Sequence, residues 1–187
     1  MSNIFSPKHL PLIWFRTALM VVILGLGGGC SSSQPPLKPA MVVFTKAVQE
    51  ACALLLPPLR EPVAKGDITA INNILEKTIS QVQSNGKTVP FNIAIADKAG
   101  IALTRYPLAK ILSMDFSKYE VIAKAKEGKI AQSRFYLPNE TKVYVVVAPI
   151  ILNSKVTGFM GFYLSDQELR EKWGLTEEEF LALNFNQ

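Results

Sequence analysis

The sequence predicts an α+β domain in which helices come first and an antiparallel sheet follows. One observation is a stripe of isoleucine, leucine and valine at helical spacing between Asp67 and Ser84. The other is the stretch Lys142–Leu164, which holds two apolar, β-branched runs joined at Asn153-Ser154. Polar turn residues between two such runs indicate a β-hairpin. We therefore expect one sheet built around this hairpin, with helices covering it.

Two helices are predicted before the first strand. Apolar residues at helical spacing run from Met41 to Leu56, and Pro57-Pro58 should end this helix because proline removes a donor and clashes with the preceding turn. In the second helix Asp67 is a suitable N-cap, and Asn85-Gly86 is a suitable left-handed stop. Cys52 lies in the first helix and is interpreted as a small buried apolar residue.

Three more strands precede or flank the hairpin. Pro90–Ala96 and Ile101–Tyr106 are joined by a turn at Asp97–Gly100, and Ile130–Leu137 leads into the hairpin through Pro138–Thr141. Asp97 is interpreted as a turn residue. Between the second and third of these strands lies an irregular piece followed by a short helix.

Capping patterns predict the short helices. Ser117 with Glu120 suggests the start of the helix after the irregular piece, and Gly128 suggests its end. Capping boxes at Ser165 and Thr176 predict two more helices after the hairpin, and Trp173, Phe180 and Leu183 are expected to pack back on the body.

The hairpin has no polar face, so both of its faces should be covered. If Asn153-Ser154 is a two-residue loop, Tyr144 opposes Tyr163, and a four-residue loop before the hairpin makes Phe135 oppose Tyr144. One face is then aliphatic and suits the helices. The other mixes aromatic, hydroxyl and small side chains, which suits a pocket wall. In this register Arg105 and Arg134 point to the aliphatic face.

The ligand-binding candidates combine this second face with the irregular segment above it. They are Tyr106, Lys110, Tyr119, Ser133, Phe135, Tyr144, Phe159 and Tyr163. The irregular segment looks too thin to form solid core, which favours a pocket. The alternative is that these tyrosines fill a core with their hydroxyls at its rim, since aromatic side chains are ordinary core residues.

Residues 1–29 have the form of a secretory signal peptide, with a basic front and a short apolar run. The end of this leader, Gly28-Gly29-Cys30, resembles a bacterial lipobox, although Leu26 stands one place earlier than the usual leucine. The resemblance implies cleavage before Cys30 and a lipid on its sulfur. Residues 30–40 are polar and proline-rich and are expected to be a flexible tether, followed by a single domain over 41–187. The alternative is an uncleaved N-terminal anchor.

The composition excludes several classes of function. The net charge of +5 is modest and forms no basic stripe, so nucleic acid is not expected as a partner. The only histidine is His9 in the leader, which removes histidine-based triads, general bases and most zinc sites from the body. No catalytic residue, metal or cofactor is predicted. An envelope enzyme using Asp97 and Asp115 as acid and base is the last-ranked alternative.

Several short motifs, taken in order, resemble an extracytoplasmic Cache domain. They are Asp97–Gly100, Asp115–Glu120 (DFSKYE), Ala148–Ile150 (API) and Gly158–Leu164 (GFMGFYL). Cache domains are PAS-like ligand sensors of bacterial chemoreceptors and histidine kinases. The likeness covers about Met41–Leu164. It implies a five- or six-stranded antiparallel sheet, with long N-terminal helices on one face and a small-molecule pocket on the other, under short helices and a loop.

Together these observations predict a lipid-anchored envelope module that binds or senses a small ligand, such as a carboxylate or an amino acid. Members of the family usually continue into a second membrane helix and a signalling domain, whereas this chain stops at Gln187. The resemblance therefore implies a separate membrane receptor or kinase as partner. Ser31 after the cysteine would favour the periplasmic side of the outer membrane in a Gram-negative cell. The alternative is a structural or assembly lipoprotein that docks a partner protein with the same fold.

Overall fold

The structure is a computed structural model that describes residues 38–86, 89–108, 114–137 and 140–186. All of them belong to one compact unit, Pro36–Gln187. The predicted signal peptide, Cys30, most of the predicted tether and Lys110 lie outside the described residues.

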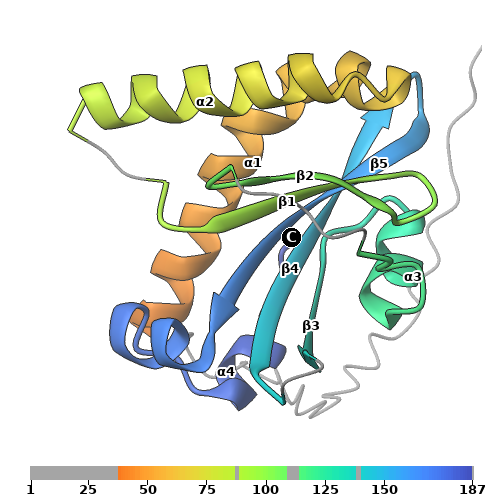
Figure 1. Ribbon diagram of the computed structural model, residues 1–187. Helices are drawn as coiled ribbons and strands as arrows, with labels where there is room; N and C mark the ends of the chain where they lie inside the picture. The colour runs from red at the N-terminus through yellow and green to blue at the C-terminus, as the bar shows by residue number, and fades with distance from the viewer. Residues whose placement is uncertain (1–37, 87–88, 109–113, 138–139, 187) are drawn as a thin grey trace, which may run out of the picture. The chain divides into compact units, whose positions relative to one another are not determined.

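A five-stranded antiparallel sheet forms the centre of this unit (Figure 1). Its strands, in sheet order, are β2 (Ala102–Tyr106), β1 (Asn92–Asp97), β5 (Lys155–Ser165), β4 (Lys142–Leu152) and β3 (Ala131–Tyr136). The hairpin predicted around Asn153-Ser154 is β4–β5, and both turn residues have positive φ, at 51° and 60°. Such a two-residue turn matches the twist of the strands that it joins. The sheet and its helices confirm the predicted α+β class.

The first helix, α1 (Pro39–Lys65), is longer than predicted at both ends. It contains Pro57, Pro58 and Pro62, so the expected stop at the proline pair is wrong. The apolar stripe continues past the prolines through Leu59 and Val63, which are both buried against the sheet. Burial of this continuing stripe offsets the lost hydrogen bonds. Proline at the first helical positions explains the early start.

The second helix, α2 (Ile68–Ser84), agrees with the sequence pattern. Asp67 caps it by accepting a hydrogen bond of 2.9 Å from the amide of Ala70. Both helices lie over the same face of the sheet, with α1 crossing β1, β4 and β5 and α2 over β2. The helix α1 approaches the sheet closely at Gly158, where a Cβ atom would lie 2.4 Å from Cγ1 of Val63 and 2.5 Å from the carbonyl oxygen of Ala96.

The C-terminal segment completes the core on this face. A π-helix, η1 (Glu168–Lys172), and α4 (Glu177–Leu181) follow β5, and the predicted capping boxes at Ser165 and Thr176 are both present. Phe180 and Leu183 are buried here, as predicted, and the ring of Trp173 stacks on Phe91 at 5.3 Å.

The predicted register between β4 and β5 is wrong by one residue over most of its length. Ile151 pairs with Val156 as expected, but a bulge before Ile151 makes Tyr144 pair with Leu164 instead of Tyr163. A one-residue slip moves every side chain of a strand to the other face. Tyr144 therefore lies on the helix side, and Val143, Val145 and Val147 lie on the side that was assigned to a pocket.

The opposite face of the sheet is covered by α3 (Glu120–Lys126) and the segment from Met114 to Tyr119, which we call the lid. The predicted capping box at Ser117 is not how α3 begins, because the helix starts at Glu120 with Tyr119 at its N-cap. The lid is tied to the start of β2: the amide of Ala102 donates to the carbonyl of Met114, and that of Phe116 donates to the carbonyl of Gly100, each at 2.9 Å.

Among the described residues, α1 is the one helix that is long and apolar enough to cross a membrane. Its buried side chains, Phe44, Leu55 and Leu59 among them, belong to the core beneath the sheet. A core helix therefore accounts for its composition.

Candidate ligand-binding cavity

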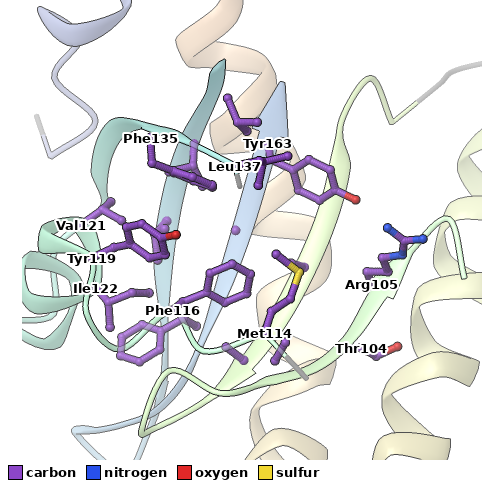
Figure 2. A pocket seen from close by; sticks show the side chains of 18 residues that line it. Thr104, Arg105, Met114, Phe116, Tyr119, Val121, Ile122, Phe135, Leu137 and Tyr163 are labelled. Atoms are coloured by element: carbon purple, nitrogen blue, oxygen red, sulfur yellow. The ribbon is translucent and has the colours of Figure 1, made fainter. Parts of the chain in front are cut away.

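A cavity of about 340 Å³ lies between the sheet and the lid (Figure 2). Small side chains make this space. The floor of the cavity is formed by Ala94 and Ala96 of β1 and Gly161 of β5, at positions where larger side chains would fill it. Around them, Phe159 and the three valines of β4 form apolar walls.

The roof comes from the lid and α3. Met114 and Phe116 point down from the lid, and Tyr119, Val121 and Ile122 close the side nearest α3. The ring of Tyr119 lies 4.8 Å from that of Phe135 on β3, which joins the roof to the wall. Because the lid is hydrogen-bonded to β2, this roof is held in place by backbone as well as by side-chain contacts.

The turn between β1 and β2 supports the lid. Oδ1 of Asp97 accepts three amide hydrogen bonds, from Ala99, Gly100 and Ile101, each at 2.9 Å. Asp97 is therefore a turn residue, as predicted. Asp115 likewise accepts from the amide of Ser117 at 2.8 Å, and the hydroxyl of Ser117, together with this amide, lowers the pKa of its carboxyl group. Each carboxylate of the acid–base alternative is thus engaged in its own turn.

Few polar groups reach the cavity. Arg105 of β2 and the hydroxyl of Tyr163 lie together at one side (Figure 2), and Thr104 lies at the margin, where its hydroxyl donates to Oδ1 of Asn72 in α2. Burial raises the pKa of Tyr163, and the nearby guanidinium of Arg105 opposes this by stabilising the ionised phenol.

The structure separates the eight residues predicted to bind a ligand into four groups. Tyr119, Phe135, Phe159 and Tyr163 line the cavity. Tyr144 and Tyr106 pack into the core on the helix side. Ser133 lines a separate, open groove beside α3 and the C-terminal segment. Lys110 is outside the described residues.

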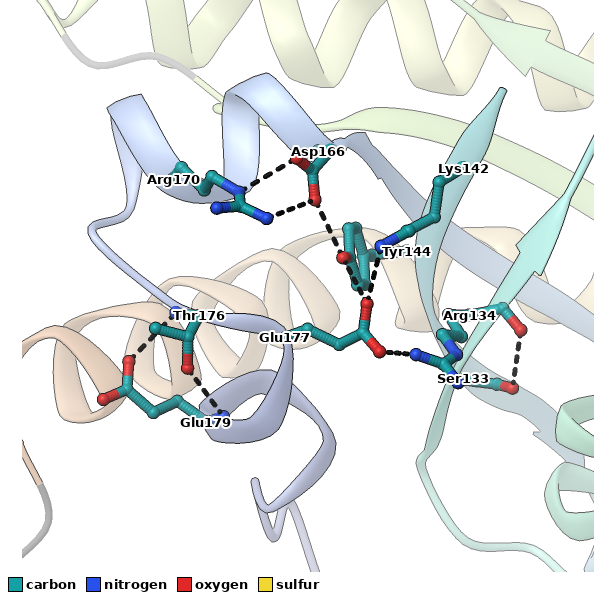
Figure 3. Close-up of polar contacts among 9 residues, drawn as sticks. All are labelled: Ser133, Arg134, Lys142, Tyr144, Asp166, Arg170, Thr176, Glu177 and Glu179. Atoms are coloured by element: carbon teal, nitrogen blue, oxygen red, sulfur yellow. Dashed lines mark hydrogen bonds and ion pairs between the residues drawn. The ribbon is translucent and has the colours of Figure 1, made fainter. Parts of the chain in front are cut away.

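Tyr144 is fully buried in a polar network instead of a pocket (Figure 3). Its hydroxyl lies 2.9 Å from Oδ1 of Asp166 and 2.8 Å from Oε2 of Glu177. Arg170 pairs with Asp166 at 2.9 Å, and Lys142 pairs with Glu177 at the same distance. Arg134 also forms an ion pair with Glu177. This network fastens α4 and the start of η1 to β3 and β4.

Arg105, Met114 and Phe116 are among the cavity residues that sequence reasoning missed. Arg105 was placed on the other face by the assumed register. The small residues Ala94 and Gly161, which pair on neighbouring strands, are the signal that could have located the floor. A sheet face with small side chains either leaves a cavity or is filled by side chains from another element.

The described residues contain no group of three or more His, Cys, Asp or Glu side chains that could hold a metal ion. The described lining of the cavity offers apolar contacts, with a guanidinium and hydroxyl groups at its side.

Comparison with known proteins finds neither a matching family model nor a matching curated sequence. The fold has matches among solved structures. A domain of a protein described as a sensory box/GGDEF family member from Vibrio parahaemolyticus aligns with a TM-score of 0.54 at 12% identity, over 74% of this chain and 60% of that one. The extracellular domain of a protein described as histidine kinase vpHK1S-Z8 gives 0.54 at 12% identity, over 74% and 57%.

The ligand-binding domain of the Pseudomonas fluorescens chemoreceptor CtaA, solved with L-isoleucine, aligns with a TM-score of 0.51 at 14% identity. The alignment covers 71% of this chain and 54% of that one, so this chain spans a little over half the length of these domains. At such identities the likeness establishes the fold alone. The chain has the α+β, PAS-like fold that Cache-like sensor domains of chemoreceptors and histidine kinases share.

Proposed function

We propose that this protein is a lipid-anchored module of the cell envelope that binds a small organic ligand and signals through a separate membrane partner. The observation that carries the proposal is the 340 Å³ cavity beneath the lid. Its size falls in the range of small-molecule sites, and its apolar walls with a few convergent polar groups are typical of them. The fold supports a sensing role, since its structural neighbours are sensor domains.

The ligand class under this proposal is a small carboxylate or amino acid. One neighbour was solved with L-isoleucine and with L-serine. In this chain Tyr119, Phe135, Phe159 and Tyr163 would contact the ligand. The structural-lipoprotein alternative expects a filled pocket, so an open cavity supports ligand binding over it.

A ligand screen tests the proposal. The full-length protein, kept in mild detergent, is screened by thermal shift against amino acids, amines and short carboxylates. We expect at least one class to raise the melting temperature. The Gly161→Val variant should lose this response, because its side chain fills the cavity floor, whereas Val43→Ala on the exposed face of α1 should keep it. A screen without any stabilising compound contradicts ligand binding.

Lipid attachment at Cys30 and the membrane partner rest on the leader sequence and need their own experiment. Expressed in a Gram-negative host, the native protein should incorporate labelled fatty acid and fractionate with membranes. Cys30→Ser should abolish labelling, while Cys52→Ser should leave it unchanged. Labelling of the Cys30→Ser variant would contradict the proposed anchor. Crosslinking from the membrane-bound protein to a receptor or kinase tests the partner.

A further inference from the structure

The lining of the cavity is chemically one-sided. Nearly all of it is alanine, valine, phenylalanine and other apolar side chains, and the polar groups are Thr104, Arg105, Tyr119 and Tyr163. Among the described residues that line it, Arg105 is the single charged side chain, and neither Asp nor Glu is present. The described lining therefore offers a partner to a negative group and none to a positive one. The carboxylate of Glu168, which acts on Tyr163 from outside the lining, is held by the amide and hydroxyl of Ser165.

Arg105 keeps its charge available. None of the ion pairs between described residues includes it, whereas Arg134 and Arg170 are both paired with carboxylates. Its guanidinium lies beside the hydroxyl of Tyr163 (Figure 2), so two hydrogen-bond donors converge at one side of the cavity. A guanidinium with a neighbouring hydroxyl suits a carboxylate, which accepts several charge-assisted hydrogen bonds.

The remaining space defines the body of the ligand. An apolar cavity of roughly 150 Å³ holds benzene, and this cavity is about 340 Å³. There is room for one aromatic ring or branched chain together with a linker that reaches Arg105. Phe159, Phe116 and Val145 would enclose such a body without offering it a hydrogen bond.

We propose that the cavity selects monocarboxylates with an apolar body, held by Arg105 and the hydroxyl of Tyr163, over the amino acids of the same shape. This inference rests on the proposed ligand-binding function and narrows its ligand class. The α-ammonium group of an amino acid is bonded to the carbon next to its carboxylate, so it would lose water beside the like charge of Arg105 without gaining an acidic partner from the described lining. A carboxylate faces no such loss beside Arg105.

Matched ligands test the selection. The probes are 3-phenylpropionate with phenylalanine and 3-phenylpropionamide, and 4-methylpentanoate with leucine, measured by calorimetry on the full-length protein in detergent. Within each set the compounds share one apolar body and differ in their charged groups. We expect at least one acid to bind about ten-fold or more tightly than its amino acid, because the ammonium group must lose water without an acidic partner, at a cost of at least that factor.

Substitutions at Arg105 identify the group responsible. Arg105→Gln should weaken the acid about ten-fold or more and leave the amide unchanged, and Arg105→Lys should restore part of the loss. Arg60→Gln, at an exposed position of α1, is the matched control and should bind like the native protein. Melting temperatures of the variants without ligand show that each is folded.

The outcomes separate this inference from the function on which it rests. Equal or tighter binding of an amino acid, or full affinity in Arg105→Gln, overturns the selection for acids and leaves ligand binding intact. If neither acid binds but another class stabilises the protein in the broad screen, the assignment of ligand class is overturned. If nothing binds in either experiment, both proposals fail.

Discussion

The hydroxyl of Tyr144 lies 2.8 Å from Oε2 of Glu177, a contact that joins the middle layer of the protein to its last helix. Glu177 also forms ion pairs with Lys142 of β4 and Arg134 of β3, which neutralise its charge. Tyr144 is fully buried whereas Glu177 and Asp166 are partly exposed, so this bond lies at the edge of the core. The contact gives the C-terminal segment a polar attachment beside the apolar one made by Phe180.

Removing this hydroxyl should destabilise the protein. Tyr144→Phe keeps the ring against Phe180 but removes the hydroxyl whose single proton lies between the carboxylates of Asp166 and Glu177. We expect the free energy of unfolding to fall by about 1.5 kcal/mol, which is typical of hydrogen bonds to charged groups. Urea unfolding measures it. Tyr136→Phe, at a tyrosine that is 58% exposed, is the control and should change stability little. Equal effects of the two variants would contradict a structural role for the network.

The same hydroxyl should make stability depend on pH in the alkaline range. Burial, together with Asp166, raises the pKa of Tyr144 from 10.0 to about 12. The folded state thus favours the neutral phenol, so this contribution is complete below pH 10 and is lost as the pH rises through 12. The difference in unfolding free energy between the native protein and Tyr144→Phe, measured by urea unfolding, should shrink as the pH rises from about 10 towards 12. A constant difference would argue against the raised pKa.

Gly158 should not tolerate a side chain. In Gly158→Ala the new Cβ atom would meet Val63 at 2.4 Å and the carbonyl oxygen of Ala96 at 2.5 Å, so α1 or the sheet must shift. Overpacking of this kind costs about 1–3 kcal/mol. Gly161→Ala is the matched control, because its Cβ would lie 3.7 Å from Val145. Thermal unfolding should show a clearly larger loss for Gly158→Ala, and equal losses would refute the close approach.

Cys52 should be inert in the folded protein. It is buried, and burial raises the pKa of its thiol from 9.0 to about 12, so almost none is thiolate at neutral pH. In a Cys30→Ser chain Cys52 is the single thiol. A chromogenic disulfide reagent at about pH 8 should react with it after denaturation and hardly at all before. Fast reaction of the native protein would show that α1 leaves the sheet readily.

Asp97 should hold the turn that supports the lid. Asp97→Ala removes the side-chain acceptor of three amides, of which Gly100 keeps the backbone carbonyl of residue 97, and we expect a loss of about 1–3 kcal/mol in unfolding free energy. Hydrogen exchange at Ala99 to Ile101 should become faster. Asp97→Asn retains an oxygen at the same place and should lose much less. If the two variants behave alike, the charge of Asp97 matters more than its geometry.

The sequence predicted the helices and strands well, but it predicted poorly which side of the sheet each side chain of β4 occupies. The apolar residues of α2 recur at helical spacing and fit no other element, so the helix and its cap at Asp67 could be predicted. The stretch of β4 is apolar on both sides and carries no alternation that could set its register. One bulge beside Ile151 therefore decided where Tyr144 points, and the sequence holds no visible sign of it.

The outline of the candidate site could also be predicted from the sequence. A thin irregular segment over a covered sheet suggested a pocket, and Tyr119 and Tyr163 do line one. The roles of Met114 and Phe116 depend on backbone pairing with the start of β2, which is a long-range contact without a local pattern. The end of α1 was mispredicted because burial of Leu59 and Val63 outweighs the local effect of the prolines.

The order of strands in the sheet also constrains how the chain can fold. The central strand, β5, is the last of the five in the sequence, and it alone joins the pair β1–β2 to the pair β3–β4. Until Lys155–Ser165 is in place, β1 and β4 each present an open edge that can pair with another chain. Assembly of the sheet must therefore wait for a late segment, and pairing across such sequence distances is slow. In a chain of this topology the edges of β1 and β4 therefore stay open to pairing until the final hairpin closes.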